Sequence, residues 1–259
     1  MYKTINYVQD EGIGTIYLNR PESMNAMDMV MRVELRTVLG EIKNDDAVKA
    51  VIISGKGKAF CAGGDISTMR SEMKSGDGVK RLQYVHTVYQ YIQSLGKPVI
   101  ASINGVAAGS GLSLACACDF RIAGSNAKFA TSFLNVGLVP DCGILHTLPR
   151  LLGLARAKEM LMLPSVISAE QAFNIGLVNK VVAQEELDNT VAEFARDLIS
   201  RSPIALKFTK EIINKAYESD FDSLLRYEAY SQDICFASEE HKSAVKKFLD
   251  KNKKGIKED

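Results

Sequence analysis

The sequence predicts an α/β protein followed by a C-terminal part that is almost entirely helical. Short apolar runs at 50–54 and 98–103 are typical of strands that are buried on both faces. Segments with apolar residues at helical spacing, 27–42 and 79–95, alternate with these runs. Such alternation with short linkers favours parallel β/α layers. The expected C-terminal helices are 169–174, 185–200, 202–216, 221–236 and 239–249.

The remaining elements complete this pattern. Residues 2–8 and 14–18 alternate apolar and polar side chains around a turn at 10–12, which indicates a β-hairpin. We place the boundary near residue 195, so that 1–195 form the core and 196–259 the helical region. The other expected elements are helices at 112–116 and 145–152, a strand at 119–123 and a short strand at 178–182.

Composition narrows the class of function. Lys and Arg (32) nearly balance Asp and Glu (31), which argues against nucleic acid or an anionic membrane as partner. No apolar run approaches the roughly 18 residues that a membrane span needs. The five cysteines lack CxxC spacing, which favours reduced thiols and a cytoplasmic protein. The three histidines show no ligand spacing, so we expect no metal.

Two glycine-rich segments, 59–66 and 104–112, follow the strands at 50–54 and 98–103. Glycine lets main-chain N–H groups approach a ligand closely, and a helix start directs unpaired N–H groups toward it. Two such turns side by side could bind one oxygen from both sides, as an oxyanion hole does. A single turn of this kind is more often only a turn. Neither segment carries a complete dinucleotide or P-loop motif.

A third segment, 136–143, holds Asp141 between Pro140 and Cys142 in an apolar stretch. A carboxylate in a dry cleft is suited to removing a proton beside a carbonyl. Asp141 is equally well explained as a turn former or as the N-cap of the next helix. The spacing alone leaves both interpretations open.

The motifs 60–65 and 104–111, with Asp119 beyond them, closely resemble the crotonase (enoyl-CoA hydratase/isomerase) superfamily. The resemblance implies a spiral of ββα repeats with a C-terminal helical part that mediates trimerisation and covers CoA. It also implies a homotrimer or a hexamer, a dimer of trimers. Further matching stretches are 18–21, 25–26, 97–101, 168–172, 176–178 and 248–249 with Lys251.

The resemblance also assigns roles to single residues. The main-chain N–H groups of Gly64 and Ser110 would hold the oxygen of an acyl-CoA thioester. CoA would enter as part of the substrate, with no separate cofactor. The residues expected around the CoA and acyl groups are Ala26, Ala62, Asp65, Ile66, Phe133, the segment 66–80 and, near the phosphates, Lys251.

Two departures from the family favour isomerisation. The two glutamates of the hydratases correspond here to Ser113 and Phe133, neither of which is acidic. Asp141 instead stands where several isomerases of the superfamily carry their acid, among them the ring-opening isomerase of phenylacetyl-CoA breakdown. We therefore expect a double-bond shift from 3-enoyl-CoA to 2-enoyl-CoA, or in a related cyclic acyl-CoA, in fatty acid or phenylacetate-type catabolism.

Three alternatives stay open at this stage. An enoyl-CoA hydratase could use another acid, such as Glu72 or Glu159. A haloaromatic acyl-CoA dehalogenase would use Asp141 as nucleophile with His86 on the preceding helix, although the chain has no Trp. A non-catalytic binding member of the superfamily is the third.

Overall fold

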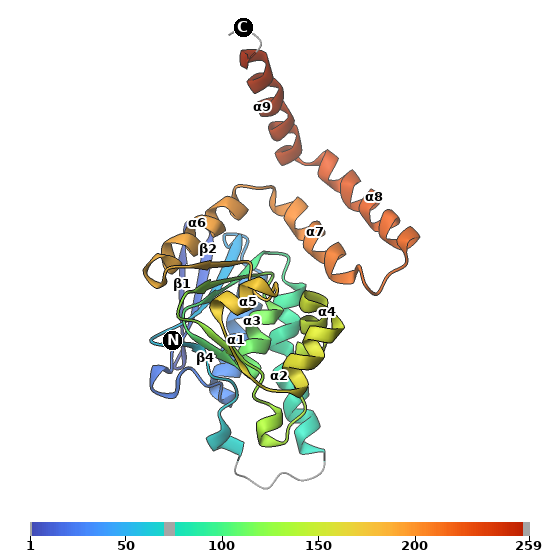
Figure 1. Ribbon diagram of the computed structural model, residues 1–259. Coiled ribbons are helices and arrows are strands. Elements are labelled where there is room, and N and C mark those ends of the chain that lie inside the picture. Colours follow the sequence, from blue (N-terminus) through green and yellow to red (C-terminus); the bar gives the residue numbers. More distant parts are fainter. Residues whose placement is uncertain (1, 70–75, 256–259) are drawn as a thin grey trace. The chain divides into compact units, whose positions relative to one another are not determined.

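The computed structural model describes residues 2–69 and 76–255, and the chain divides into two compact units, 1–198 and 199–259. The first unit contains every strand of the described chain and the helices up to α6 (Figure 1). The second contains α7 to α9. Each unit is described separately below.

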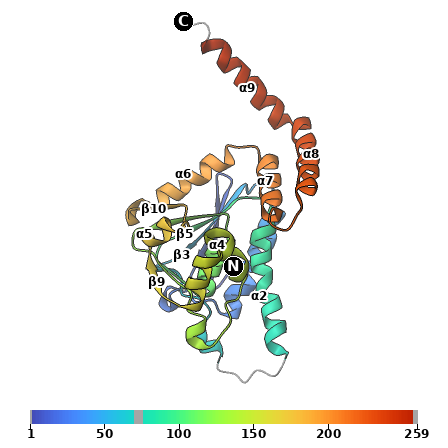
Figure 2. The same cartoon turned by 45° about the vertical axis from the view of Figure 1, so that its right-hand side comes forward.

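The strands of the first unit form two sheets. The larger sheet has the order β1-β2-β3-β5-β7-β10, and the smaller one has the order β4-β6-β8-β9. In the larger sheet β1 pairs antiparallel with β2, and all other neighbours are parallel. Figure 2 shows β3 and β5 beside each other in the larger sheet. The strands are β1 (Ile5–Asp10), β2 (Ile13–Leu18), β3 (Ala50–Gly55), β4 (Ala59–Cys61), β5 (Val99–Ile103), β6 (Val106–Ala108), β7 (Phe120–Gly124), β8 (Lys128–Ala130), β9 (Val166–Ser168) and β10 (Lys180–Val182).

Helices follow most of these strands. The α-helices are α1 (Met29–Lys43), α2 (Asp77–Ser94), α3 (Ser110–Ala117), α4 (Ile144–Met162), α5 (Ala169–Asn174), α6 (Leu187–Ile199), α7 (Pro203–Lys215), α8 (Phe221–Ala237) and α9 (Glu239–Gly255). Short 3-10 helices are η1 (Pro21–Ser23), η2 (Ile66–Met69), η3 (Leu134–Val136) and η4 (Gln184–Glu186).

The core of the first unit forms where apolar helix faces meet the central strands. All six residues of β3 are buried, as expected for a strand that is covered on both faces. Helix α1 begins at Asp28, whose carboxylate accepts the Met31 N–H over 2.8 Å. Its buried face contributes about 1.5–3 kcal/mol per large apolar side chain. That face includes Met31, Leu35, Val38, Leu39 and Ile42.

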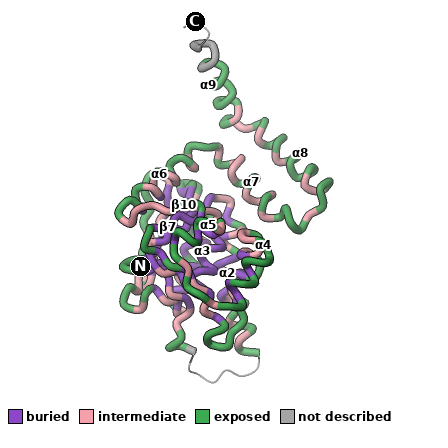
Figure 3. Tube along the Cα trace, in the orientation of Figure 1, coloured by how far each residue is buried: buried purple, intermediate pink, exposed green. Residues whose placement is uncertain are grey.

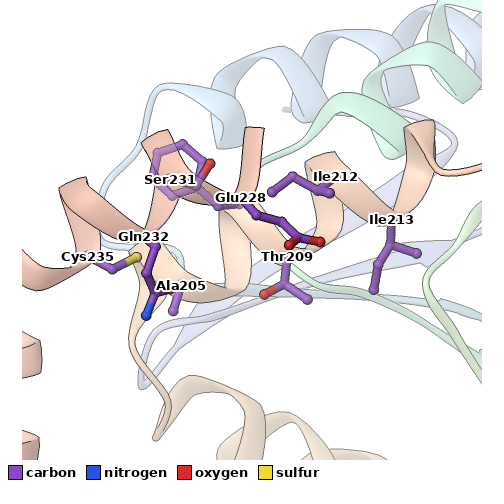
Figure 4. A pocket seen from close by; sticks show the side chains of 9 residues that line it. Ala205, Thr209, Ile212, Ile213, Glu228, Ser231, Gln232 and Cys235 are labelled. Carbon is purple, nitrogen blue, oxygen red and sulfur yellow. The ribbon is translucent and has the colours of Figure 1, made fainter. Parts of the chain in front are cut away.

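The second unit buries far less. In Figure 3 the buried residues are concentrated in the first unit, and α7 and α8 carry none. Helices α7 and α8 lie side by side (Figure 2) and line an open pocket of about 260 Å³ (Figure 4). Ala205, Thr209 and Ile212 line it from α7, and Glu228 and Cys235 line it from α8. None of the residues predicted for the site lines this pocket.

The structure corrects one expectation from the sequence and adds to another. The glycine-rich segments are not plain strand-to-helix turns, because each contains a three-residue strand of the smaller sheet, β4 or β6. Strands this short show no alternation that a pattern could reveal. The helix expected at 145–152 ends at a kink, because Gly153 has φ 75° and ψ 162°, and a second helical segment that the sequence analysis did not predict follows it to Met162. None of the described helices combines the length and the apolar character that a bilayer crossing requires.

Candidate active site

The first glycine-rich turn is held against the residues before α1. Met27 donates its N–H to the Gly63 oxygen over 2.7 Å, and the Asp65 N–H donates to the Met27 oxygen over 3.1 Å. Because Met27 bonds with residues on both sides of Gly64, the N–H of Gly64 points away from this bridge. Within the described chain this N–H donates no hydrogen bond. It therefore stays available to a ligand oxygen.

The second turn leads directly into α3. Gly109 precedes the helix at φ 50° and ψ −125°, a conformation that glycine adopts far more readily than other residues. Its N–H donates to the Ala130 oxygen over 3.0 Å at the end of the β6–β8 pairing. Ser110 is the first residue of α3, so its N–H is one of the unpaired donors of a helix N-terminus. The positive end of the helix dipole favours an anion at the same place.

The two turns are in close contact. A methyl group at Gly63 would lie 2.9 Å from the Ala108 oxygen and 3.6 Å from the Ser110 nitrogen. One at Gly111 would lie 2.2 Å from the Cys61 oxygen. Glycine is therefore required here for packing as well as for turning. The structure places the two predicted N–H donors, Gly64 and Ser110, in neighbouring turns.

Asp141 is joined to the second turn. The Ser113 hydroxyl of α3 donates to the Asp141 main-chain oxygen over 3.1 Å. The next two residues, Cys142 and Gly143, have φ of 59° and 80°, so the backbone turns sharply before α4. The N-cap of α4 is Gly143, without a side-chain cap, which excludes the capping role for Asp141. Its Oδ1 is buried and has no hydrogen-bond partner within the described chain.

The two positions that correspond to the hydratase glutamates are both buried. Ser113 is fully buried, and Phe133, at the start of η3, is 7 % exposed. Neither side chain carries the carboxylate that a hydratase glutamate supplies at that position. Asp141 is therefore the acid that the structure places beside the second turn.

The residues expected around CoA gather near Arg20. Its Nη1 lies 3.0 Å from Asp65 Oδ2, and it donates to the Ala26 oxygen over 2.6 Å. Hydrogen bonds from Ser67, and then Arg20, hold the pKa of Asp65 below its usual value. Ala62 is tied to this region through its N–H and the Met24 oxygen, 2.9 Å away. The arrangement fixes the outer side of the first turn.

Other residues from the sequence analysis lie apart from this group. Ile66 is 60 % exposed on η2. Glu159 pairs with Arg156 over 2.7 Å on an open face of α4, as a solvated helix residue does. His86 is half-buried on α2, and its Nε2 has no hydrogen-bond partner in the described chain.

Two expected residues cannot be assigned a contact. Lys251 belongs to α9 of the second unit, and its side chain lies outside the described residues. Glu72 also lies outside the described residues, as does part of the segment 66–80. Among the residues that are described, no group of three or more His, Cys, Asp or Glu side chains could hold a metal ion.

The sequence analysis missed a buried polar group next to these turns. Arg32 of α1 and Tyr89 of α2 are 7 % and 6 % exposed, and the Tyr89 hydroxyl donates to the Ser110 oxygen over 3.3 Å. Burial is the main cause that raises the pKa of the Cys142 thiol to about 12 and the pKa of Tyr89 well above its usual value. The helical spacing could have indicated that Arg32 is buried. Arg32 precedes Leu35 by three residues and Leu39 by seven, so it lies on the apolar face of α1.

The fold and the paired turns define a class of acyl-CoA enzymes, and comparison with known proteins agrees. Residues 8–258 match the model of the enoyl-CoA hydratase/isomerase family, and the chain belongs to this family. The chain is 40 % identical to the short-chain-enoyl-CoA hydratase of Clostridium acetobutylicum over 95 % of both chains. It is 35 % identical to the 1,2-epoxyphenylacetyl-CoA isomerase of Escherichia coli, over 93 % of this chain and 94 % of that protein.

A solved structure shows the same fold. The crystal structure of an enoyl-CoA hydratase from Mycobacterium smegmatis superposes with a TM-score of 0.92 at 32 % identity, covering 96 % of this chain and 97 % of the other. The expected crotonase-like α/β fold is thereby confirmed. The relatives include both hydratases and an isomerase, so the family alone leaves the reaction type open.

Proposed function

We propose that this enzyme is an acyl-CoA isomerase in which Asp141 moves a single proton. The carboxylate removes a proton from C2 of a 3-enoyl-CoA, which gives a dienolate. The same proton then returns at C4, and the product is the conjugated 2-enoyl-CoA. Nothing is added or lost, so one carboxylate is enough. A cyclic acyl-CoA with an equivalent double bond would react in the same way.

The main-chain N–H groups of Gly64 and Ser110 stabilise the dienolate in this proposal. The negative charge gathers on the thioester oxygen as the C2 proton leaves. A donor aimed at such an oxygen contributes about 3 kcal/mol to the transition state. The free N–H groups of the two neighbouring turns support this role.

One observation carries the proposal. Asp141 brings a buried, unpartnered carboxylate oxygen to the second turn, whereas the two positions of the hydratase acids hold the buried Ser113 and Phe133. Adding water across a double bond needs one group to activate water and another to protonate carbon. Asp141 is the carboxylate that the described structure places beside the second turn, whereas Asp65 of the first turn is held by Arg20 and Ser67.

Hydration is the second candidate function. The 40 % identity to a protein named short-chain-enoyl-CoA hydratase favours it. It would require Asp141 to perform both proton transfers, or Glu72 to contribute. Glu159 does not support hydration, because it is 58 % exposed and paired with Arg156.

Two substrates separate these functions. With 3-hexenoyl-CoA, we expect absorbance to rise in the band of the conjugated enoyl thioester. With crotonyl-CoA, a fall in the same band would identify a hydratase. A steady signal with 3-hexenoyl-CoA and a rapid fall with crotonyl-CoA would reject the isomerase.

We also propose a homotrimer or hexamer of the cytoplasm, acting in fatty acid or phenylacetate-type catabolism. The many exposed large apolar side chains of the second unit support assembly; they include Tyr217, Phe221, Tyr230, Phe236 and Phe248. The free state of all five cysteines supports a reducing compartment. Light scattering coupled to size-exclusion chromatography gives the number of subunits, and a monomer would contradict this part of the proposal.

A further inference from the structure

Arg32 is a buried cation that the proposed reaction does not use. It lies in the first turn of α1 and is 7 % exposed. No carboxylate of the described chain lies within ion-pair distance of it. Burying an unpaired charge costs free energy, so a folded protein seldom retains one without a compensating interaction.

The contacts of Arg32 reach both segments of the candidate site. Its Nε donates to the Met27 oxygen over 3.4 Å. That oxygen also accepts the Asp65 N–H, so it belongs to the bridge that orients Gly64. Arg32 also lies beside the thiol of Cys142, the residue after Asp141. One side chain thus contacts the first turn and the loop of the acid.

The charge of Arg32 has one clear counterpart. Burial lowers the pKa of Arg32, but Tyr89, Cys142 and Asp141 outweigh this and leave it raised. At neutral pH Tyr89 and Cys142 are uncharged, because their own pKa values lie far above 7. Asp141 is the carboxylate among these three neighbours.

We propose that Arg32 is a positioning residue, whose guanidinium holds the Gly64 turn and the Asp141 loop together and balances the charge that moves between them. The reaction named here rests on the proposed isomerase function. When Asp141 takes the C2 proton, its negative charge disappears and an equal charge develops on the thioester oxygen. A fixed cation in contact with both segments stabilises the site before and after this transfer without moving.

Three variants test the proposal. Arg32→Met keeps the length of the side chain and removes its charge, whereas Arg32→Lys keeps the charge. Arg36→Met is the matched control, because Arg36 lies one turn later on the exposed face of α1, 4.9 Å from the Tyr84 ring. We expect Arg32→Met to lower kcat with 3-hexenoyl-CoA about 100-fold with little change in KM, as for the loss of an oxyanion donor. Arg32→Lys should have a higher kcat than Arg32→Met. Arg36→Met should have the kcat and KM of the wild type.

A ligand that needs no turnover separates this inference from the isomerase proposal. Acetoacetyl-CoA forms an ultraviolet-absorbing enolate, and a site that stabilises negative charge on the thioester oxygen raises its enolate fraction. We expect Arg32→Met to bind acetoacetyl-CoA with a clearly lower enolate fraction than the wild type. If the wild type lacks isomerase activity but this difference appears, the isomerase fails and the role of Arg32 stands.

Unchanged kcat and an unchanged enolate fraction in a folded Arg32→Met would overturn the role of Arg32 and leave the isomerase intact. Circular dichroism and thermal unfolding report whether the variant folds. If Arg32→Met does not fold, the kinetics of Arg32→Lys test the role of Arg32 instead. A roughly tenfold loss of kcat at constant KM supports the inference, since Lys cannot reproduce the planar contacts of Arg. Wild-type kcat in Arg32→Lys would then reject it.

Discussion

The Ser113 hydroxyl donates to the main-chain oxygen of Asp141 over 3.1 Å, and it lies 3.3 Å from the Gly109 oxygen. This contact joins the helix that starts at the second turn to the loop of the acid. A serine at this position therefore links two parts of the site.

Ser113→Ala should move Asp141 relative to the turn without removing any reacting group. A hydrogen bond of this kind contributes about 1 kcal/mol, so we expect kcat for isomerisation to fall by up to tenfold at a similar KM. The control is Ser102→Ala, because the buried Ser102 hydroxyl has no partner within the described chain. Its loss should leave both kcat and the free energy of unfolding in urea unchanged. Equal kinetics in the two variants would contradict the positioning role of Ser113.

Asp141→Asn should separate catalysis from binding. The amide keeps the shape of the side chain but cannot accept the C2 proton, so we expect isomerisation to fall at least 100-fold. The dissociation constant of the acyl-CoA, measured by calorimetry, should change little. Glu159→Gln, on the open face of α4, should have wild-type kinetics in both the isomerase and the hydratase assay. An active Asp141→Asn would remove Asp141 from the mechanism.

The sequence predicted the fold from its longest patterns. The buried strand 50–54 and the apolar stripe of 27–42 correspond to β3 and α1 within a few residues, because both elements bury an entire face. The strand β6 escaped prediction because its three residues form a sheet only through distant partners on β4 and β8. Contacts of this kind depend on tertiary structure and leave no periodic signal.

For the site, the sequence analysis located the two glycine-rich turns and the Asp141 segment. It missed the buried polar side chains of Arg32 and Tyr89 next to them. Glycines marked both turns, and the close approach of Gly63 to Ala108 explains one of them physically. Arg32 looked like an ordinary polar residue of an amphipathic helix. Its role depends on Cys142, which is distant in sequence and reaches Arg32 through a left-handed backbone turn. No local pattern predicts that contact.

The thiols should differ strongly in reactivity. Burial raises the pKa values of Cys61 and Cys116 to about 11 and that of Cys142 to about 12, so these thiols are neutral and shielded at pH 8. Cys235 on α8 is half-buried. We expect iodoacetamide at pH 8 to label Cys235 first and to label all five cysteines in urea, as read by peptide mass spectrometry. Early labelling of Cys142 in the native protein would contradict its burial beside Asp141.

Gly63→Ala should separate the two turns. The new methyl group would lie 2.9 Å from the Ala108 oxygen, which belongs to the backbone and cannot rotate away as a side chain could. The segment that carries Gly64 would have to shift, and we expect isomerase activity to fall far more than the thermal stability alone would explain. Gly76→Ala is the matched control, because Gly76 also has a positive φ, 93°, but no atom of the described residues lies within 4 Å of its added methyl group. Both variants carry the backbone strain of alanine at positive φ, about 1 kcal/mol. The measurement is the enolate fraction of bound acetoacetyl-CoA in the two variants. A lower fraction in Gly63→Ala than in Gly76→Ala would show that the proposed oxyanion site depends on the contact between the two turns. Equal fractions would contradict that dependence.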